Sequence, residues 1–185
     1  HSQGQPLPGM TIRAVDLVTR QPLPAGEIGE LAVGGYLTPG YFRAPELDAE
    51  AFDGDGYFLT GDLGSIDADG RVRFRGRLKE MIKTGGINVA PLEVEAVLLQ
   101  HPDTVQAYVV GIPDPAKGEI VAAAIELRGG ATTDAASIVA FCRERLASYK
   151  VPARLVFRSA TEFPRTPTGK IYKPSLRDEL ATIRE

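Results

Sequence analysis

One lysine at the end of a turn-rich segment is the first residue whose chemistry we consider. Lys170 closes the stretch PRTPTGK (164–170), where prolines, threonines and a glycine precede it. Such a composition favours an exposed loop, and an ammonium group on a loop can neutralise the charge of a phosphate. The stretch is not a P-loop, because that motif requires a glycine five residues before Gly169, where Pro164 stands. Taken alone, Lys170 is typical of an ordinary loop lysine.

A carboxylate at the end of YFLTGD (57–62) is the second candidate. Asp62 follows a Thr-Gly pair, and a carboxylate held at such a corner can accept two hydrogen bonds from the paired hydroxyls of a ribose. By themselves, the same three residues are more typical of a simple turn.

The longest candidate segment is GRLKEMIKTGGINVAPLEVE, residues 76 to 95, in which Lys79 and Lys83 precede two adjacent glycines. Gly85 and Gly86 do not fit the dinucleotide-binding pattern G-x-G-x-x-G. Between two β-favouring runs they predict a hairpin turn.

The elements that would position these residues divide the chain near residues 77–80. The first part is strand-rich, with β-favouring runs at 11–18, 26–35 and 71–76 and a short acidic helix at 44–52. The second part mixes helices and strands. It predicts a hairpin at 81–89, helices at 91–100, 133–147 and 174–184, and strands at 105–112, 120–127 and 154–157. Thr133 or Asp134 is expected to cap the middle helix. The predicted fold class is therefore α+β.

Arginines occupy every second position at the end of the first part: Arg71, Arg73, Arg75 and Arg77. On a strand they would line one face. A nucleic-acid surface would need interleaved aromatic residues and more positive charge, so the first three arginines indicate a solvated edge strand. Arg77 differs, because the chain changes character just after it.

Composition excludes several other classes of protein and site. Twenty-one basic residues stand against 24 acidic ones, for a net charge of −3, which argues against a nucleic-acid-binding chain. Two histidines and one cysteine cannot supply the usual ligands of a zinc site. Cys142 lies in an apolar run and is interpreted as a core residue, not a nucleophile. With no membrane-spanning run and no signal peptide, the sequence predicts a cytoplasmic protein.

Four segments in a fixed order carry a resemblance to a known family: YFLTGD, the segment 76–95, SYKVP (148–152) and PRTPTGK. Together they resemble the carboxyl-terminal part of the adenylate-forming, AMP-binding enzymes, in which GGINVAPLEVE looks most like the acyl-CoA synthetase or fatty-acid–CoA ligase branch. The resemblance implies three parts. Residues 1–76 would end a large AMP-binding domain, 77–80 would be a hinge, and 81–185 would be a mobile α+β domain of the acyl-CoA synthetase type.

The resemblance also implies roles in adenylation. Asp62 matches the aspartate that binds the ribose hydroxyls, and Arg77 matches an arginine that contacts the same nucleotide. Lys170 matches the lysine that reaches the acyl carboxylate and the α-phosphate. Leu59 departs from the pattern, because many relatives carry a basic residue there, which weakens a phosphate contact from this corner but not the role of Asp62.

The second half-reaction is implied by the remaining residues. Lys79 matches the hinge about which the small domain swings between two poses. In the second pose, Lys83 would face the acyl-adenylate, while Gly85 and Gly86 would let the backbone approach the pantetheine arm of coenzyme A. The implied partners are a carboxylic acid, ATP with Mg²⁺, and coenzyme A, with no metal bound by the protein itself.

Two alternatives to the synthetase interpretation remain. The chain could belong to an adenylation domain that loads a carrier protein, or it could be a nucleotide-binding or interaction domain without catalysis. The family's Gly-rich phosphate loop, its adenine-stacking segment and its acyl pocket are not found in these 185 residues. We therefore expect the chain alone to be inactive and to depend on a preceding N-terminal region.

Overall fold

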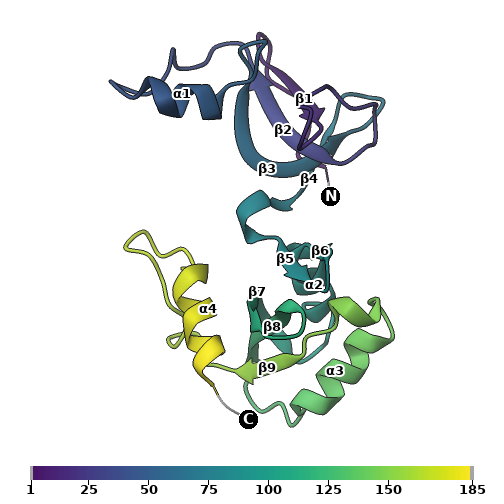
Figure 1. The fold of residues 1–185 in the computed structure, drawn as a ribbon. Helices are drawn as coiled ribbons and strands as arrows, with labels where there is room; N and C mark the ends of the chain where they lie inside the picture. The colour runs from purple at the N-terminus through teal and green to yellow at the C-terminus, as the bar shows by residue number, and fades with distance from the viewer. Residues whose placement is uncertain (1, 184–185) are drawn as a thin grey trace. The chain divides into compact units, whose positions relative to one another are not determined.

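The structure, a computed structural model, describes residues 2–183 and consists of two compact units (Figure 1). One unit ends at Lys79 and the other begins at Glu80. Both contain strands and helices, which confirms the predicted α+β fold class. Within residues 2–183, no helix combines the length and apolar character that a membrane crossing requires.

The first unit is built on a four-stranded antiparallel sheet in the order β1-β2-β3-β4. Its strands are β1 (Thr11–Val15), β2 (Gly29–Gly34), β3 (Phe58–Ile66) and β4 (Val72–Arg77), and α1 (Pro45–Ala51) lies between β2 and β3. The sequence predicted every one of these elements except β3. β4 is an edge strand, with Arg71 exposed just before it and Arg73 and Arg75 exposed on it, which confirms the interpretation of these three arginines.

An ionic cluster ties β1 to the turn that precedes β3. The Arg13 guanidinium lies 2.7 Å from Asp53 and 2.8 Å from Asp55, and it stacks on the Tyr57 ring. Burial alone would raise the pKa of Asp53, but the hydrogen bond from Arg13 and two backbone N–H donors outweigh burial and hold that pKa below its ordinary value. The turn that feeds β3 is therefore fixed on the sheet.

The second unit contains a five-stranded sheet in which β6-β5-β8-β7 are neighbours and β9 pairs in parallel with β8. The strands are β5 (Ile82–Thr84), β6 (Ile87–Val89), β7 (Thr104–Asp114), β8 (Gly118–Leu127) and β9 (Arg154–Phe157). Single-turn 3₁₀ helices occupy Leu78–Glu80, where the units meet in sequence, and Ser148–Lys150.

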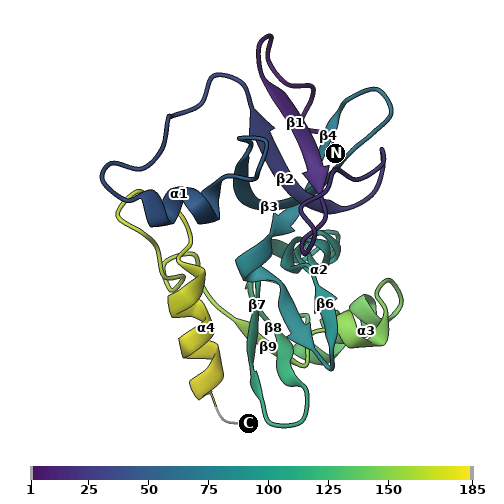
Figure 2. The same ribbon diagram turned by 45° about the horizontal axis from the view of Figure 1, so that its top comes forward.

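Helices cover both faces of this sheet. On one face lie α2 (Pro91–Leu98) and α3 (Ala135–Arg143), and on the other lies α4 (Lys173–Thr182), as Figures 1 and 2 show. Residues of β8 alternate between the two cores, because Val121 and Ile125 pack with α2 and α3 whereas Ala122 and Ala124 pack with α4. Because both faces of β8 are buried, its sequence is a nearly continuous run of apolar residues.

Local signals placed these helices correctly. Pro91 opens α2, and Asp134 caps α3 by accepting a hydrogen bond from the Ser137 backbone N–H at 2.8 Å. Of the two predicted caps, Asp134 is therefore the one observed. The predicted last helix matches α4 up to Thr182, and residue 184 of that prediction lies outside the described residues.

Cys142 is fully buried on the inner side of α3, as its interpretation as a core residue requires. Burial raises the pKa of its thiol, so the reactive thiolate is scarce near neutral pH. We predict that the native chain reacts with a thiol reagent only as fast as it unfolds, whereas the denatured chain reacts at once. Stoichiometric labelling of the folded protein within the mixing time would contradict this prediction.

Candidate functional site

A bulge in β3 positions the candidate ribose ligand Asp62. Between the pairs Ala32↔Leu59 and Glu30↔Leu63 the register shifts, so β3 holds more residues than the facing segment of β2. Gly61 adopts a positive φ of 71° inside this bulge. The interpretation of Thr-Gly-Asp as a simple turn is therefore wrong, because the three residues lie within a strand that continues to Ile66.

Buried Glu30 holds the bulge in place. One of its carboxylate oxygens accepts a hydrogen bond from the Gly61 backbone N–H at 2.9 Å, and the other pairs with Arg20. Thr60 adds a hydrogen bond from its hydroxyl to the Leu31 carbonyl at 2.7 Å. The sequence analysis did not identify Glu30, although a glutamate at a predicted buried strand position was a signal that could have found it.

We predict that Glu30→Ala lowers the free energy of unfolding of the first unit by about 1–3 kcal/mol, because the Gly61 N–H loses its buried acceptor. Chemical denaturation followed by circular dichroism measures this change. Glu27→Ala is the matched control, since Glu27 is exposed in the same segment and should change stability little. Equal effects of the two substitutions would contradict the role of Glu30.

Asp62 and Arg77 lie opposite each other on β3 and β4. They are Cα partners in the ladder, and Arg77 Nε is 2.7 Å from Asp62 Oδ1. The Asp62 side chain is about one-quarter exposed and that of Arg77 about half exposed, at 25% and 48%. The structure thus brings together the two residues predicted to contact a nucleotide, while each keeps part of its surface available.

A cavity of about 330 Å³ in the first unit is lined by Arg77 of this pair. Arg77, Thr60 and Gly61 line it, together with the aromatic rings of Tyr41 and Phe58. Lys79, the predicted hinge residue, also lines the cavity and ends the first unit. Glu30 and Glu50 line it as well, so the cavity combines cationic, acidic and aromatic residues next to Arg77.

In the second unit, Gly85 and Gly86 form the two-residue loop of the β5–β6 hairpin, as predicted. Their φ angles are 56° and 79°, which is the left-handed pair that a type I′ turn requires. An added Cβ would meet no atom within 4 Å at either position, so the backbone is open to an approaching ligand. Lys83 lies exposed on β5, and its backbone N–H donates to Glu119 at 2.8 Å.

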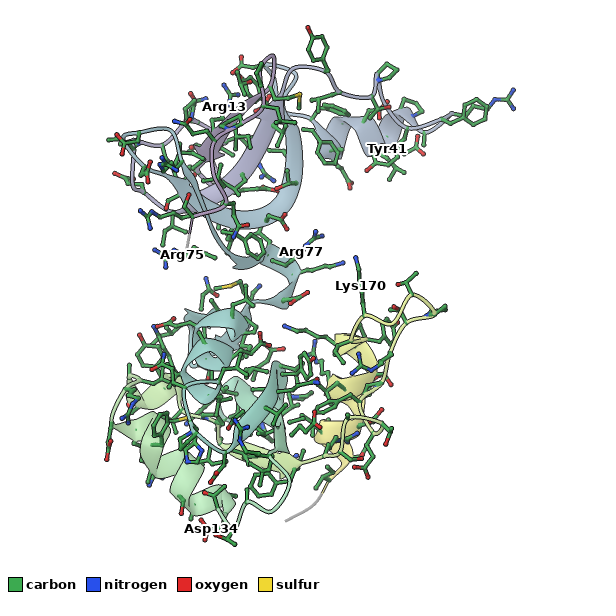
Figure 3. The ribbon with its side chains drawn as sticks, turned by 180° about the vertical axis from the view of Figure 1, so that it is seen from behind. Arg13, Tyr41, Arg75, Arg77, Asp134 and Lys170 are labelled. Carbon is green, nitrogen blue, oxygen red and sulfur yellow. The ribbon has the colours of Figure 1, made fainter. Side chains whose placement is uncertain are left out.

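Lys170 lies at the end of a tight turn in the loop before α4 (Figure 3). The Gly169 N–H donates to the Thr166 carbonyl at 2.8 Å, and the Thr166 N–H donates to the Lys170 carbonyl at 2.7 Å. Pro167 takes the second turn position and Gly169 the left-handed one, with φ of 83°. The turn residues that precede Lys170 in the sequence thus fix the conformation of its backbone, while its side chain is exposed.

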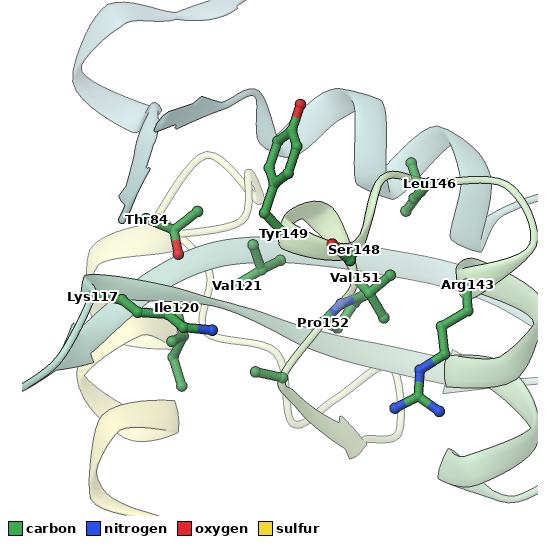
Figure 4. A pocket seen from close by; sticks show the side chains of 11 residues that line it. Thr84, Lys117, Ile120, Val121, Arg143, Leu146, Ser148, Tyr149, Val151 and Pro152 are labelled. Carbon is green, nitrogen blue, oxygen red and sulfur yellow. The ribbon is translucent and has the colours of Figure 1, made fainter. Parts of the chain in front are cut away.

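A second cavity, of about 430 Å³, opens beside the Gly85–Gly86 hairpin (Figure 4). Thr84 lines it, and so does Lys117, whose carbonyl accepts the Gly85 N–H at 2.9 Å. Figure 4 shows Lys117 and Arg143 toward opposite ends of the pocket, with Tyr149 between them. The floor is apolar, so the cavity suits an elongated ligand with negatively charged groups.

The predicted site residues thus fall into groups on separate units. Asp62, Arg77 and Lys79 belong to the first unit, whereas Lys83, the glycine pair and Lys170 belong to the second. Within the second unit, Lys170 and Lys83 are carried by different elements, the loop before α4 and strand β5.

Residues 93–170 match the family model of the AMP-binding enzyme C-terminal domain. The chain belongs to the adenylate-forming, AMP-binding enzyme superfamily. This membership confirms the resemblance carried by the four sequence segments. The matched range includes Lys170 and most of the second unit.

Relatives of the superfamily extend the likeness over nearly the whole chain. Sulfoacetate–CoA ligase of Cupriavidus necator is 43% identical over 157 residues, which is 84% of this chain and 30% of that protein. A 4-coumarate–CoA ligase-like protein of Oryza sativa subsp. japonica is 42% identical over 180 residues, 97% of this chain and 32% of that protein. The chain therefore spans about a third of the length of the curated relatives it matches.

Solved structures of the superfamily share the fold. ATP-bound MatB from Rhodopseudomonas palustris superposes with a TM-score of 0.92 at 37% identity, covering 100% of this chain and 36% of that one. The amide bond synthetase McbA from Marinactinospora thermotolerans gives a TM-score of 0.86 at 38% identity, covering 96% and 36%.

Proposed function

We propose that this chain is the carboxyl-terminal part of an ATP-dependent acyl-CoA synthetase. The enzyme would join a carboxylic acid to coenzyme A and release AMP and pyrophosphate. The observation that carries the proposal is the rigid turn that presents the exposed Lys170 within a matched AMP-binding C-terminal domain. The term 'complete enzyme' is used for a polypeptide in which an AMP-binding N-terminal region precedes this chain.

In the first half-reaction, a carboxylate oxygen attacks the α-phosphorus of ATP, the bond to the β-phosphate breaks, and pyrophosphate leaves. Negative charge is then shared between the acid and the α-phosphate, and the Lys170 ammonium stabilises it. Asp62 accepts hydrogen bonds from the ribose hydroxyls, and Arg77 contacts the same nucleotide. The ion pair of Asp62 with Arg77 orients both groups before the nucleotide binds.

In the second half-reaction, the coenzyme A sulfur attacks the acyl carbon, the bond to AMP breaks, and the thiol proton is released. The open backbone at Gly85 and Gly86 admits the pantetheine arm, and Lys83 faces the acyl-adenylate. The cavity beside the hairpin supports this assignment, because Lys117 and Arg143 offer positive charge to phosphates of the acceptor.

Rotation about Lys79 would exchange the two poses. Lys79 lies in a single 3₁₀ turn between the units, and a short irregular segment of this kind can absorb a change in φ and ψ. We extend the proposal to a cytoplasmic location and to fatty-acid substrates of the ligase branch.

Mg²⁺ would accompany the ATP phosphates, whose charge it neutralises. Among residues 2–183, no cluster of three or more His, Cys, Asp or Glu side chains is arranged to hold an ion. No step is assigned to Mg²⁺, which would enter with the ATP phosphates.

The proposal predicts that the isolated chain catalyses no acid-dependent exchange of pyrophosphate into ATP. The complete enzyme, in contrast, should catalyse this exchange and then form a thioester when coenzyme A is added. Exchange by the 185-residue chain alone would contradict the proposed division of the active site. Exchange by the complete enzyme without thioester formation would instead favour a carrier protein or an amine as acceptor.

An amine acceptor is the second candidate function. The likeness to the amide bond synthetase McbA supports it. The third candidate is a nucleotide-binding domain without catalysis. Binding of AMP or coenzyme A to the isolated chain in a titration, with no acyl-adenylate made by the complete enzyme, would favour this candidate.

A further inference from the structure

The first residue of α4 is a cation in an unfavourable place. Lys173 begins the helix, where the macrodipole favours negative charge and disfavours a lysine. The N-cap position before it is Tyr172, whose side chain makes no capping hydrogen bond. A residue that is unfavourable for its local structure must be stabilised by other contacts in the fold, and such positions are often functional.

The compensation comes from two carboxylates distant in sequence. Lys173 Nζ lies 3.0 Å from Glu80 Oε2 and 3.1 Å from Glu95 Oε1. Glu95 is buried in α2, and the same oxygen accepts the Val109 N–H at 2.9 Å. Burial alone would lower the pKa of Lys173, but the carboxylates of Glu95 and Glu80 outweigh burial and raise it. The ammonium is therefore charged and held between three elements of the second unit.

Each of these links has a place in the proposed reaction. Glu80 directly follows Lys79, the proposed hinge residue, and Lys173 follows Lys170 by three residues. The backbone between the two lysines is also fixed, because the Tyr172 N–H donates to the Pro164 carbonyl at the other end of the loop at 2.8 Å. A continuous set of contacts thus leads from the start of the second unit to the base of the Lys170 loop.

A second cation on α4 reinforces the connection. Arg177, one helical turn after Lys173, donates to Glu119 at 2.8 Å, and the other oxygen of Glu119 accepts the Lys83 backbone N–H. The helix is therefore bound through side chains both to the residue after the hinge and to the strand that carries Lys83.

We propose that Lys173 is a positioning residue that fixes the Lys170 loop to Glu80, so that the loop and the start of the second unit move as one body. The role in catalysis rests on the proposed function, whereas the mechanical link does not. Rotation at Lys79 would then carry Lys170 to or from the nucleotide without a separate loop movement.

Hydrogen exchange on the 185-residue chain tests the link without any activity. Glu80→Ala leaves Glu95 to pair with Lys173 and should preserve the fold. We expect the Gly169 and Tyr172 amides to exchange about 5- to 10-fold faster in this variant, as the loss of one hydrogen bond of ordinary net strength predicts while Glu95 still pairs with Lys173. The melting temperature should change little, because Glu95 still neutralises the Lys173 ammonium.

Matched variants separate positioning from general destabilisation. Glu93→Ala removes another glutamate of the second unit, in α2, whose partner is Lys150 at 2.6 Å, and should leave exchange of the Lys170 loop amides unchanged. Lys173→Arg should retain the protection that Lys173→Met loses, because the guanidinium can still pair with both carboxylates. Unchanged exchange of the Gly169 and Tyr172 amides in Glu80→Ala would overturn the proposal, as would equal acceleration in Glu93→Ala.

The complete enzyme gives the second readout. Glu80→Ala should lower kcat for acyl-adenylate formation about 10-fold with KM for ATP unchanged, since only positioning in the transition state is lost. An unchanged kcat would overturn the positioning role. If the complete enzyme made no acyl-adenylate at all, the proposed function would fail, and the exchange measurements would still decide whether the link exists.

Discussion

Replacing Lys170 by alanine in the complete enzyme is expected to slow acyl-adenylate formation by about 10²–10³-fold, the usual cost of removing one preorganised group that stabilises transition-state charge. The expected cost to folding is small, because Lys170 is exposed and its turn is held by backbone hydrogen bonds. Acid-dependent pyrophosphate exchange measures the first effect, and thermal unfolding measures the second.

Two further measurements make this result specific to Lys170. Arg128→Ala removes one positive charge from an exposed position between β8 and α3 of the same unit and should leave pyrophosphate exchange within about 2-fold of the unmodified enzyme. Thioester formation from supplied acyl-adenylate should be nearly unaffected by Lys170→Ala, because that step is assigned to Lys83 and the glycine hairpin. An adenylation rate that survives Lys170→Ala would remove the basis of the proposed function.

Local sequence patterns were sufficient for most of the fold. Pro91, the Gly85–Gly86 pair and Asp134 each act on backbone within a few residues, and each element that they predicted is present. The continuous apolar run at 120–125 likewise indicated a buried strand, and β8 contributes residues to both cores. Such signals depend on local chain geometry, so the elements that they specify can be predicted without knowledge of tertiary contacts.

The missed features depend on contacts between distant residues. The bulge in β3 was taken for a turn because Thr60 and Gly61 are typical turn residues. Contacts to β2, about 30 positions earlier, stabilise them within a strand: Glu30 accepts the Gly61 N–H and the Leu31 carbonyl accepts the Thr60 hydroxyl. The pairing of Lys173 with Glu80 spans 93 positions. Neither contact leaves a periodic signal in one sequence, so the supporting residues of a site are harder to predict than the residues that meet the ligand.

Substitution of Gly86 by alanine should have the opposite effect to Lys170→Ala on the two half-reactions. Gly86 has a φ of 79°, which costs an L-residue about 1–2 kcal/mol, and a methyl group would also stand where the pantetheine arm must approach. A displacement of about 1 Å can cost about 10²-fold in rate. We therefore expect thioester formation to slow by about 10²-fold while pyrophosphate exchange stays close to normal.

Gly130→Ala isolates the effect of position from the effect of backbone strain. Gly130 has a φ of 82° and, like Gly86, no atom within 4 Å of an added Cβ, but it lies in the turn that precedes α3. Both substitutions impose a similar conformational cost, so both should lower the melting temperature by similar amounts. Only Gly86→Ala should slow release of AMP from supplied acyl-adenylate on addition of coenzyme A. Equal slowing by both variants would mean that the hairpin acts through stability, and the glycine pair would then lose its assignment to the acceptor.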